Sequence, residues 1–194
     1  MTTLRHPVNI SKKYLIKLSI PLFFSNLAIP MVGVVDTVLM GHLENEKYLV
    51  ATSIATSFMT MILWSFGFLR MGTTGLVAQS LGKGDYREIV SDIIRNLVIA
   101  IIVSLLIIFL QYFFLNIINN FFITSEVTSN LIKDYITIRV YSAPAELVLY
   151  VLIGLFLGLQ KTQTSSLIVL TLSVLNIIFS SFFVIILDLK VQGV

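Results

Sequence analysis

One acidic residue lies inside an almost unbroken apolar run, VVDTVLMGHL, at residues 34–43. A carboxyl group such as that of Asp36 can take up a proton or bind a cation. Placing an aspartate near the middle of a membrane helix costs roughly 2.5–3.5 kcal/mol on insertion scales. Asp36 is therefore a functional candidate, and the alternative is a silent carboxylate that hydrogen-bonds to a neighbour near a helix end.

Two more polar residues lie in the last apolar run. Asn176 and Ser180 are four positions apart, so they share one face of a helix. At about 1.5 Å of rise per residue, they lie about 21 and 27 Å from the inner end of their helix, and Asp36 lies about 28 Å along its own. These three side chains could form an oxygen cage for Na⁺ or share a proton. Hydrogen bonding that serves only to hold two helices together is an equal alternative.

Other polar residues and prolines also interrupt the apolar runs. Glu146 is a second intramembrane acid, and Arg70 and Arg139 lie within apolar runs, where pairing with an acid is the expected role. Pro21 and Pro30 both fall in the run that holds Asp36. Each removes a backbone donor and tends to kink a helix, so this helix is predicted to bend.

Two groups of glycines predict close helix packing. Gly154 and Gly158 match a small-xxx-small stripe. Gly72, Gly75 and Gly82 are expected to allow a close approach in the same way, and their spacing is far from that of a phosphate-binding loop.

The composition indicates the solvent around these residues. The 194 residues are 57% hydrophobic and 12% charged, with a mean hydropathy of +0.96. Soluble domains carry about 25% charged residues. So few charges cannot cover a globular surface, although they suffice for loops between helices, and the chain is predicted to be an integral membrane protein in contact with a lipid bilayer.

The composition also excludes several function classes. The absence of cysteine rules out disulfide scaffolds, zinc knuckles and thiol catalysis. The two histidines lie in separate loops, so no metal site is expected beyond a possible Na⁺ at Asp36. The pI near 9.2 does not indicate nucleic-acid binding, because the cations do not cluster with aromatic residues on one surface.

The predicted fold is an all-α membrane bundle. Five segments can cross roughly 30 Å of hydrocarbon as helices, over about residues 18–41, 49–81, 89–115, 135–159 and 165–187. The N-terminal tail, the loop GKGDYRE and the turn LQKTQT hold most of the lysines and arginines of the loops. This bias predicts a multi-pass protein of the inner membrane with a cytoplasmic N-terminus.

Several stretches resemble those of the multidrug and toxic compound extrusion (MATE) transporters, in particular their DNA-damage-inducible, DinF-like branch. FLRMGTTGLVAQSLGKGD resembles the second-helix signature of that family, and VDTVLMGHL resembles the end of its first helix. IRVYSAPAELVLYVLIGLFLGLQKTQT resembles its fourth helix and the following turn, and LNIIFSSFFVIILDLKVQGV resembles its fifth helix. The resemblance runs from about residue 11 to residue 194, with the motifs in the same order.

The resemblance implies an antiporter that exports amphipathic, often cationic drugs while Na⁺ or H⁺ flows in. Family members have twelve helices in two lobes, so residues 1–194 would supply five helices of the six-helix N-terminal lobe, and the C-terminal lobe would be a missing partner. By position, Asp36 and Asn176 match residues of the family's cation site, and Pro21 matches the proline at which the first helix bends. Ser180 departs from an aspartate found in several members, which favours H⁺ over Na⁺ as the coupling ion.

Two other function classes remain to be weighed. The chain could be a non-transporting remnant or an assembly subunit, with intramembrane polar residues that only hold helices together. The length of the reading frame after Val194 would distinguish this alternative from a transporter. An enzyme is not expected, because no HExxH, GxSxG or paired aspartate motif lies within a span, and no cofactor is expected apart from the coupling ion.

Overall fold

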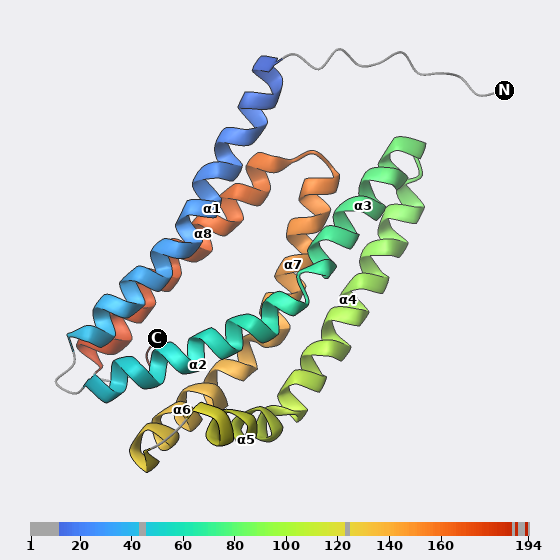
Figure 1. Ribbon diagram of the computed structural model, residues 1–194. Helices are drawn as coiled ribbons and strands as arrows, with labels where there is room; N and C mark the ends of the chain where they lie inside the picture. Colours follow the sequence, from blue (N-terminus) through green and yellow to red (C-terminus); the bar gives the residue numbers. More distant parts are fainter. Residues whose placement is uncertain (1–11, 43–45, 123–124, 188, 190–192, 194) are drawn as a thin grey trace.

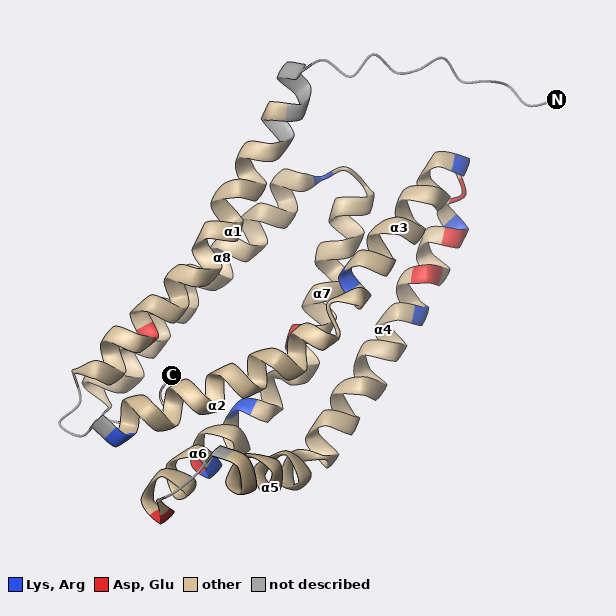
Figure 2. Ribbon diagram, in the orientation of Figure 1, with Lys and Arg blue, Asp and Glu red and all other residues tan. Residues whose placement is uncertain are grey.

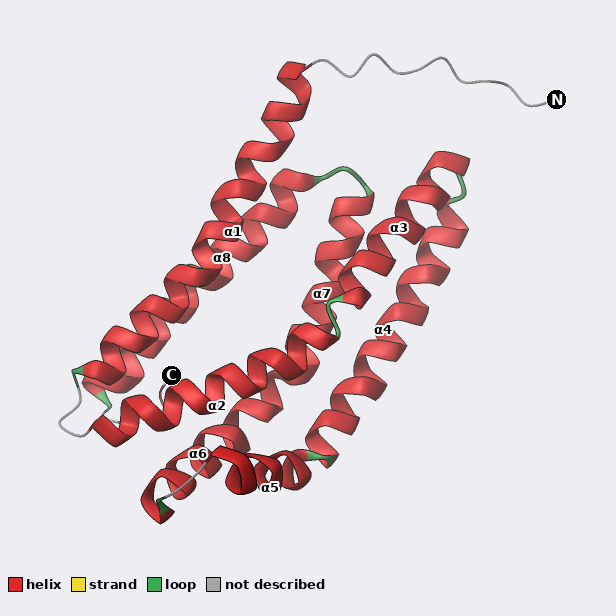
Figure 3. Cartoon of the chain, viewed as in Figure 1, coloured by secondary structure: helices red, strands yellow, loops and turns green. Residues whose placement is uncertain are grey.

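The computed structural model describes residues 12–42, 46–122, 125–187, 189 and 193, and the elements within these ranges are helical (Figure 3). Short turns and loops join the helices, and the chain passes repeatedly between the two ends of the bundle (Figure 1). In chain order the elements are α1 (Lys12–Gly41), α2 (Glu46–Ser65), α3 (Phe68–Lys83), α4 (Tyr86–Phe109), α5 (Gln111–Phe122), α6 (Glu126–Arg139), the 3₁₀ turn η1 (Val140–Ser142), α7 (Ala143–Gly158), α8 (Thr162–Ser181) and the π-helical turn η2 (Phe182–Ile186).

Five stretches of the described residues are long and apolar enough to span a bilayer. Their bounds are Ser19–Gly41, Lys47–Lys83, Tyr86–Phe109, Glu126–Gly158 and Thr162–Ile186. Many large apolar side chains on these helices are exposed, among them Phe23, Ile102 and Phe109. Such side chains are stable on the surface only where lipid replaces water, so the prediction of an all-α bundle with five spans is confirmed.

The second span is built from two helices rather than the single run expected over residues 49–81. At the break, the amides of Phe66 and Gly67 bond to carbonyls three residues back, at 3.0 and 2.9 Å, as in a tight 3₁₀ turn. Glycine has the lowest helix propensity after proline, which explains why the helix is interrupted next to Gly67. The axis of the span changes direction between α2 and α3 (Figure 1).

The third span is shorter than expected, because α4 ends at Phe109 instead of continuing to residue 115. The following helix, α5, lies across the end of the bundle (Figure 1). It buries Leu115 and Ile118 in the core while Asn116 and Asn119 stay exposed. An amphipathic helix of this kind gains more by covering the bundle end than by extending a span.

A sharp turn joins α3 to α4. Gly84 closes α3 in the left-handed conformation, with φ of 74°, which glycine adopts without steric cost. The next residue, Asp85, accepts a hydrogen bond from the amide of Glu88 at 3.0 Å and so caps the start of α4. The two helices therefore form a tight hairpin. Charged residues gather along this hairpin and near helix ends elsewhere (Figure 2).

The discontinuity between α6 and α7 lies in the fourth span. The 3₁₀ turn η1 separates the two helices, and Pro144 lies in the first turn of α7, where its missing amide hydrogen is not needed. The core of the bundle lies around this junction, with fully buried Val140, Ala143 and Leu147 packed against residues of α2 and α4.

Close packing of α7 against α3 depends on two glycines. A Cβ at Gly154 would lie 2.6 Å from the carbonyl oxygen of Arg70, and one at Gly158 would lie 2.7 Å from the Cβ of Val77. Real Cβ atoms do not approach this closely, so the packing role predicted for this glycine pair is confirmed.

The same expectation was wrong for the glycines of α3. A Cβ at Gly72, Gly75 or Gly82 would meet nothing within 4 Å among the described residues. The reason is the orientation of α3, whose buried face carries Thr73, Val77 and Ser80 toward the neighbouring helices. The three glycines lie outside that face.

We predict that Gly158→Ala destabilises the protein by about 1–3 kcal/mol, the usual cost of overpacking a tight contact. The added methyl group would clash with Val77 and with the carbonyl oxygen of Thr74, 2.9 Å away. Gly75→Ala is the matched control, because alanine there meets open space and favours the helix by up to about 1 kcal/mol. Denaturant unfolding in detergent micelles, followed by circular dichroism, measures both changes. Equal stability of the two variants would contradict the proposed contact.

Candidate functional site

The first and last long helices form a pair that positions the acid of the first helix. Helices α1 and α8 pack along each other and run in the same direction (Figure 1). A buried contact between the hydroxyls of Ser25 and Ser166, at 3.4 Å, joins their N-terminal halves. Asp36 lies near the other end of the pair, in the penultimate turn of α1.

The carboxyl group of Asp36 lies against α8. Its side chain interacts with the hydroxyl of Ser180, which is 4% exposed. The Ser180 hydroxyl also donates a long hydrogen bond of 3.5 Å to Oδ1 of Asn176. The structure thus places Ser180 beside both Asp36 and Asn176, while Asn176 itself is exposed. The cation or proton site that the sequence suggested for these three residues stays a prediction.

An unsatisfied oxygen marks this cluster. Among the described residues, the buried side-chain oxygens without a hydrogen-bond partner are Oδ1 of Asp36 and Oγ1 of Thr162. Thr162 lies at the opposite end of α8, in its first turn. Buried polar groups are nearly always paired, so an open carboxylate oxygen calls for a proton or a cation.

The predicted bend of the first helix is not visible as a break. Both Pro21 and Pro30 lie inside an uninterrupted α1, and Pro21 is half-buried. A proline nevertheless leaves one carbonyl of the preceding turn without its amide partner, which makes the helix easier to bend there. The hinge at Pro21 stays a prediction.

The two intramembrane arginines have different surroundings. Arg139 forms an ion pair with Glu146 and donates a second hydrogen bond to Ser142, so the expectation of an acidic partner is confirmed for this residue. The side chain of Arg70 is exposed, and no ion pair joins it to an acid in the part of the chain that the structure describes. The expected pairing is therefore wrong for Arg70. Its backbone carbonyl oxygen lies against Gly154, where α7 packs closely on α3.

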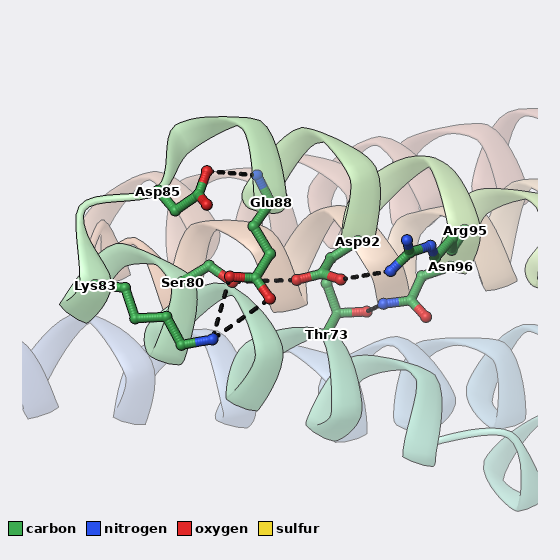
Figure 4. A network of polar contacts seen from close by, with 8 residues as sticks. All are labelled: Thr73, Ser80, Lys83, Asp85, Glu88, Asp92, Arg95 and Asn96. Atoms are coloured by element: carbon green, nitrogen blue, oxygen red, sulfur yellow. Dashed lines mark hydrogen bonds and ion pairs between the residues drawn. The ribbon is translucent and has the colours of Figure 1, made fainter.

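Sequence reasoning missed a polar network between α3 and α4 (Figure 4). Asp92 is 5% exposed, accepts a hydrogen bond from Ser80 at 3.2 Å and pairs with Arg95 at 3.5 Å. One turn further along α4, Asn96 donates a hydrogen bond of 3.0 Å to Thr73. The signal available in the sequence was that Thr73 and Ser80, seven residues apart, share one face of a helix, and that Asp92 and Asn96, four residues apart, share one face of the next helix beyond the tight turn.

No group of three or more His, Cys, Asp or Glu side chains that could hold a metal occurs among residues 12–42, 46–122, 125–187, 189 and 193. The oxygen cluster of Asp36, Asn176 and Ser180 contains a single formal charge. A site of this kind suits a monovalent ion or a proton better than a divalent metal, which prefers several charged oxygen ligands.

Comparisons with known proteins agree with the resemblance seen in the sequence. Residues 21–182 match the family model described as MatE. The chain is 34% identical over 186 residues to the DNA damage-inducible protein F of Escherichia coli (strain K12), in a match covering 94% of this chain and 40% of that protein. It is 30% identical over 154 residues to the Multidrug resistance protein MdtK of Cronobacter sakazakii, covering 79% and 33%. The chain therefore spans well under half the length of these relatives.

Solved structures show the same arrangement of helices. An outward-facing multidrug resistance MATE family transporter of the MOP superfamily superposes with a TM-score of 0.84 at 19% identity, over 92% of this chain and 39% of that one. A MATE in the straight conformation gives a TM-score of 0.83 at 18% identity, with the same coverage. At these identities the likeness establishes the fold alone.

We predict that Asp92→Ala destabilises the α3–α4 hairpin by about 1–3 kcal/mol, because the variant leaves the buried Ser80 hydroxyl without its acceptor. Asp92→Asn keeps an acceptor oxygen and is expected to lose less stability. Asp85→Ala is a useful comparison, since it removes an exposed helix cap worth about 0.5–2 kcal/mol. Hydrogen exchange of the α4 amides measures the local effect, and unchanged protection in Asp92→Ala would contradict a stabilising role.

Proposed function

The chain belongs to the MatE family, and from this premise we propose that it forms the ion-coupling part of a cation-driven multidrug efflux antiporter. The observation that carries the proposal is the half-buried carboxyl of Asp36, which leaves an oxygen unpaired against α8. The family is one of transporters rather than enzymes. One matched relative is named a multidrug resistance protein, which supports amphipathic or cationic drugs as substrates.

The proposed coupling step is the exchange of a proton at Asp36. An ionised carboxylate can only accept hydrogen bonds, whereas the protonated acid can also donate one. A proton on Asp36 would therefore remove a buried charge and give the open oxygen a role in the contact between α1 and α8. Protonation can drive a change of shape only if it favours one arrangement of α1 over another. Pro21 is the proposed place where α1 adjusts.

Proton coupling is preferred to sodium coupling because of the small charge of the cluster. Asn176 and Ser180 are neutral, so Asp36 is the single formal charge among the three proposed ligands. Na⁺ is held by electrostatic attraction to oxygen ligands, and its binding weakens as negative charge is removed. A proton forms a covalent bond to the carboxylate and needs no such cage.

The proposed setting is the inner membrane, with the N-terminus in the cytoplasm. The turn between α3 and α4 and the turn before α8 lie at the end of the bundle where α1 begins (Figure 1), and they hold Lys83, Arg87 and Lys161. Basic loops favour the cytoplasmic side. Alternating access also requires a second group of helices facing this one, so a C-terminal lobe is proposed as the partner.

We predict that Asp36→Asn abolishes drug efflux while the protein still reaches the membrane. The measurement is ethidium efflux from efflux-deficient bacteria that express the complete reading frame encoding this chain. Efflux is expected to fall to the level of cells without the protein, because asparagine cannot exchange a proton. Asp134→Asn, at an exposed acid of α6, is the matched control and should keep wild-type efflux. Full efflux by Asp36→Asn would overturn the assignment.

We predict that efflux continues in sodium-free medium and stops when a protonophore collapses the proton gradient. Ser180→Asp is expected to change this behaviour, because a second carboxylate strengthens attraction for Na⁺ on the order of tenfold or more. Transport assays in everted vesicles with and without Na⁺ measure both effects. Sodium dependence of the unaltered protein would refute proton coupling, and an Asn176→Ala variant that kept full efflux would remove Asn176 from the site.

A further inference from the structure

Helix α5 is too short to cross a bilayer. Its 12 residues rise about 18 Å, whereas the hydrocarbon core of a bilayer is about 30 Å thick. The helix follows the break at Leu110 and lies across the end of the bundle, where the span formed by α4 ends (Figure 1). This position puts α5 at the level of the bilayer surface.

One side of α5 is fixed to the protein. Leu115 and Ile118 are buried and belong to the core. The ring of Phe114 makes an edge-on contact with Phe58 of α2, with the ring centroids 6.1 Å apart. These contacts set the rotation of the helix about its own axis, and so they decide which side chains face away from the bundle.

A second side of α5 is polar. Asn116 and Asn120 are four residues apart, so they share one face, and both are exposed. The nearby Asn119 accepts a hydrogen bond of 2.8 Å from the hydroxyl of Ser129 on α6. Amide groups hydrogen-bond well to water and are costly to leave unpaired in hydrocarbon, so this side suits the aqueous surface.

The third side of α5 is an apolar stripe formed by Phe113, Ile117 and Phe121. These residues are spaced by four, so they lie along one face of the helix. Phe113 and Phe121 are 58% and 77% exposed, and Ile117 between them is partly exposed. A row of large apolar side chains that no described residue covers is unfavourable in water, and it marks a surface that meets another apolar medium.

The neighbouring surface of α4 indicates which medium this is. Ile102, Leu105 and Phe109 are all exposed toward the end of that span, where lipid replaces water. Phe113 follows Phe109 by four residues across the break, so the lipid-facing surface of α4 ends beside the apolar stripe of α5. The stripe is therefore best explained as a continuation of the surface that contacts lipid.

We propose that α5 is an interfacial anchor, which lies in the plane of the bilayer surface with its apolar stripe inserted among the acyl chains. Its three sides then meet protein, water and lipid. The helix QYFFLNIINNFF contains no charged residue, so the anchor binds by burial of apolar surface rather than by attraction to anionic headgroups. The inference depends on the chain being embedded in a membrane and is independent of the role of Asp36.

Anchoring at α5 also restrains the fourth span. The hydrogen bond from Ser129 to Asn119 links α5 to α6, which is the first part of that span. A tilt of α6 would have to pull the apolar stripe out of the lipid or push the asparagines into it. Both movements are unfavourable, so the anchor holds this end of the fourth span at a fixed depth.

The test measures the surroundings of single side chains of α5 in the complete protein that contains this chain, reconstituted in lipid vesicles. Single cysteines in a background free of other cysteines carry a nitroxide spin label, and electron paramagnetic resonance measures its collisions with oxygen, which concentrates among acyl chains, and with a water-soluble nickel complex. Oxygen collisions are expected to exceed nickel collisions in Phe113→Cys and Phe121→Cys. The order is expected to reverse in Asn116→Cys and Asn120→Cys.

A reference and a second lipid complete the experiment. Ile102→Cys, on the lipid-facing part of α4, gives the collision rates of a label among acyl chains. Vesicles of phosphatidylcholine and of phosphatidylglycerol are expected to give the same label depths, because α5 has no charge to distinguish them. Size-exclusion chromatography establishes that each labelled variant is folded, and either phenylalanine position decides the matter if the other variant does not fold.

Three results would overturn the inference. Nickel collisions that prevail at positions 113 and 121 would place the stripe in water. Labels shielded from both reagents would show that another protein segment or a second copy covers it. Insertion in phosphatidylglycerol alone would show that headgroup charge, rather than apolar burial, holds the helix.

Discussion

Within a bilayer, polar groups must find their partners inside the protein, because the hydrocarbon offers none. The hydroxyls of this chain largely obey that constraint. Thr37 and Ser65 donate to carbonyls one turn back along their own helices, at 2.7 and 2.9 Å. Thr56 reaches across to Tyr135 on another helix. Against this background of satisfied groups, the open carboxylate oxygen of Asp36 is an exception with a cost, and exceptions of this kind are expected at functional sites.

The same constraint explains how much of the fold could be predicted from the sequence. Long apolar runs must be helices, so the five spans followed from composition and length alone. The breaks inside the spans did not, because they depend on tertiary packing. Nothing in the uninterrupted run that contains Leu110 shows that α5 turns across the bundle to bury Leu115 and Ile118.

The residues of the candidate site also fall into two groups, those whose position could be predicted from the sequence and those whose position could not. The level of Asp36 and Ser180 along their helices could be calculated from the helical rise, and the structure places them in contact. Sequence spacing could not show which glycines face a neighbouring helix. In the structure, Gly154 packs directly against α3, whereas Gly75 has no neighbour within 4 Å of a Cβ placed there. Asp92 escaped notice because it follows a charged turn and resembles a solvated residue, although packing of α4 against α3 buries it.

The charges of the bundle interior are handled in two different ways. Arg139 and Glu146 form an ion pair of zero net charge inside the fourth span. Opposite charges in contact offset each other in a medium of low dielectric constant, so this pair can remain in a span without a further counter-ion. Asp36 lies instead beside the neutral hydroxyl of Ser180, and one of its oxygens has no hydrogen-bond partner. An ionised carboxylate in that position keeps much of its desolvation cost, and a bound proton would remove the cost by removing the charge. The neutral serine adds no charge that would help to hold Na⁺, so the same arrangement favours the proton as the proposed coupling ion.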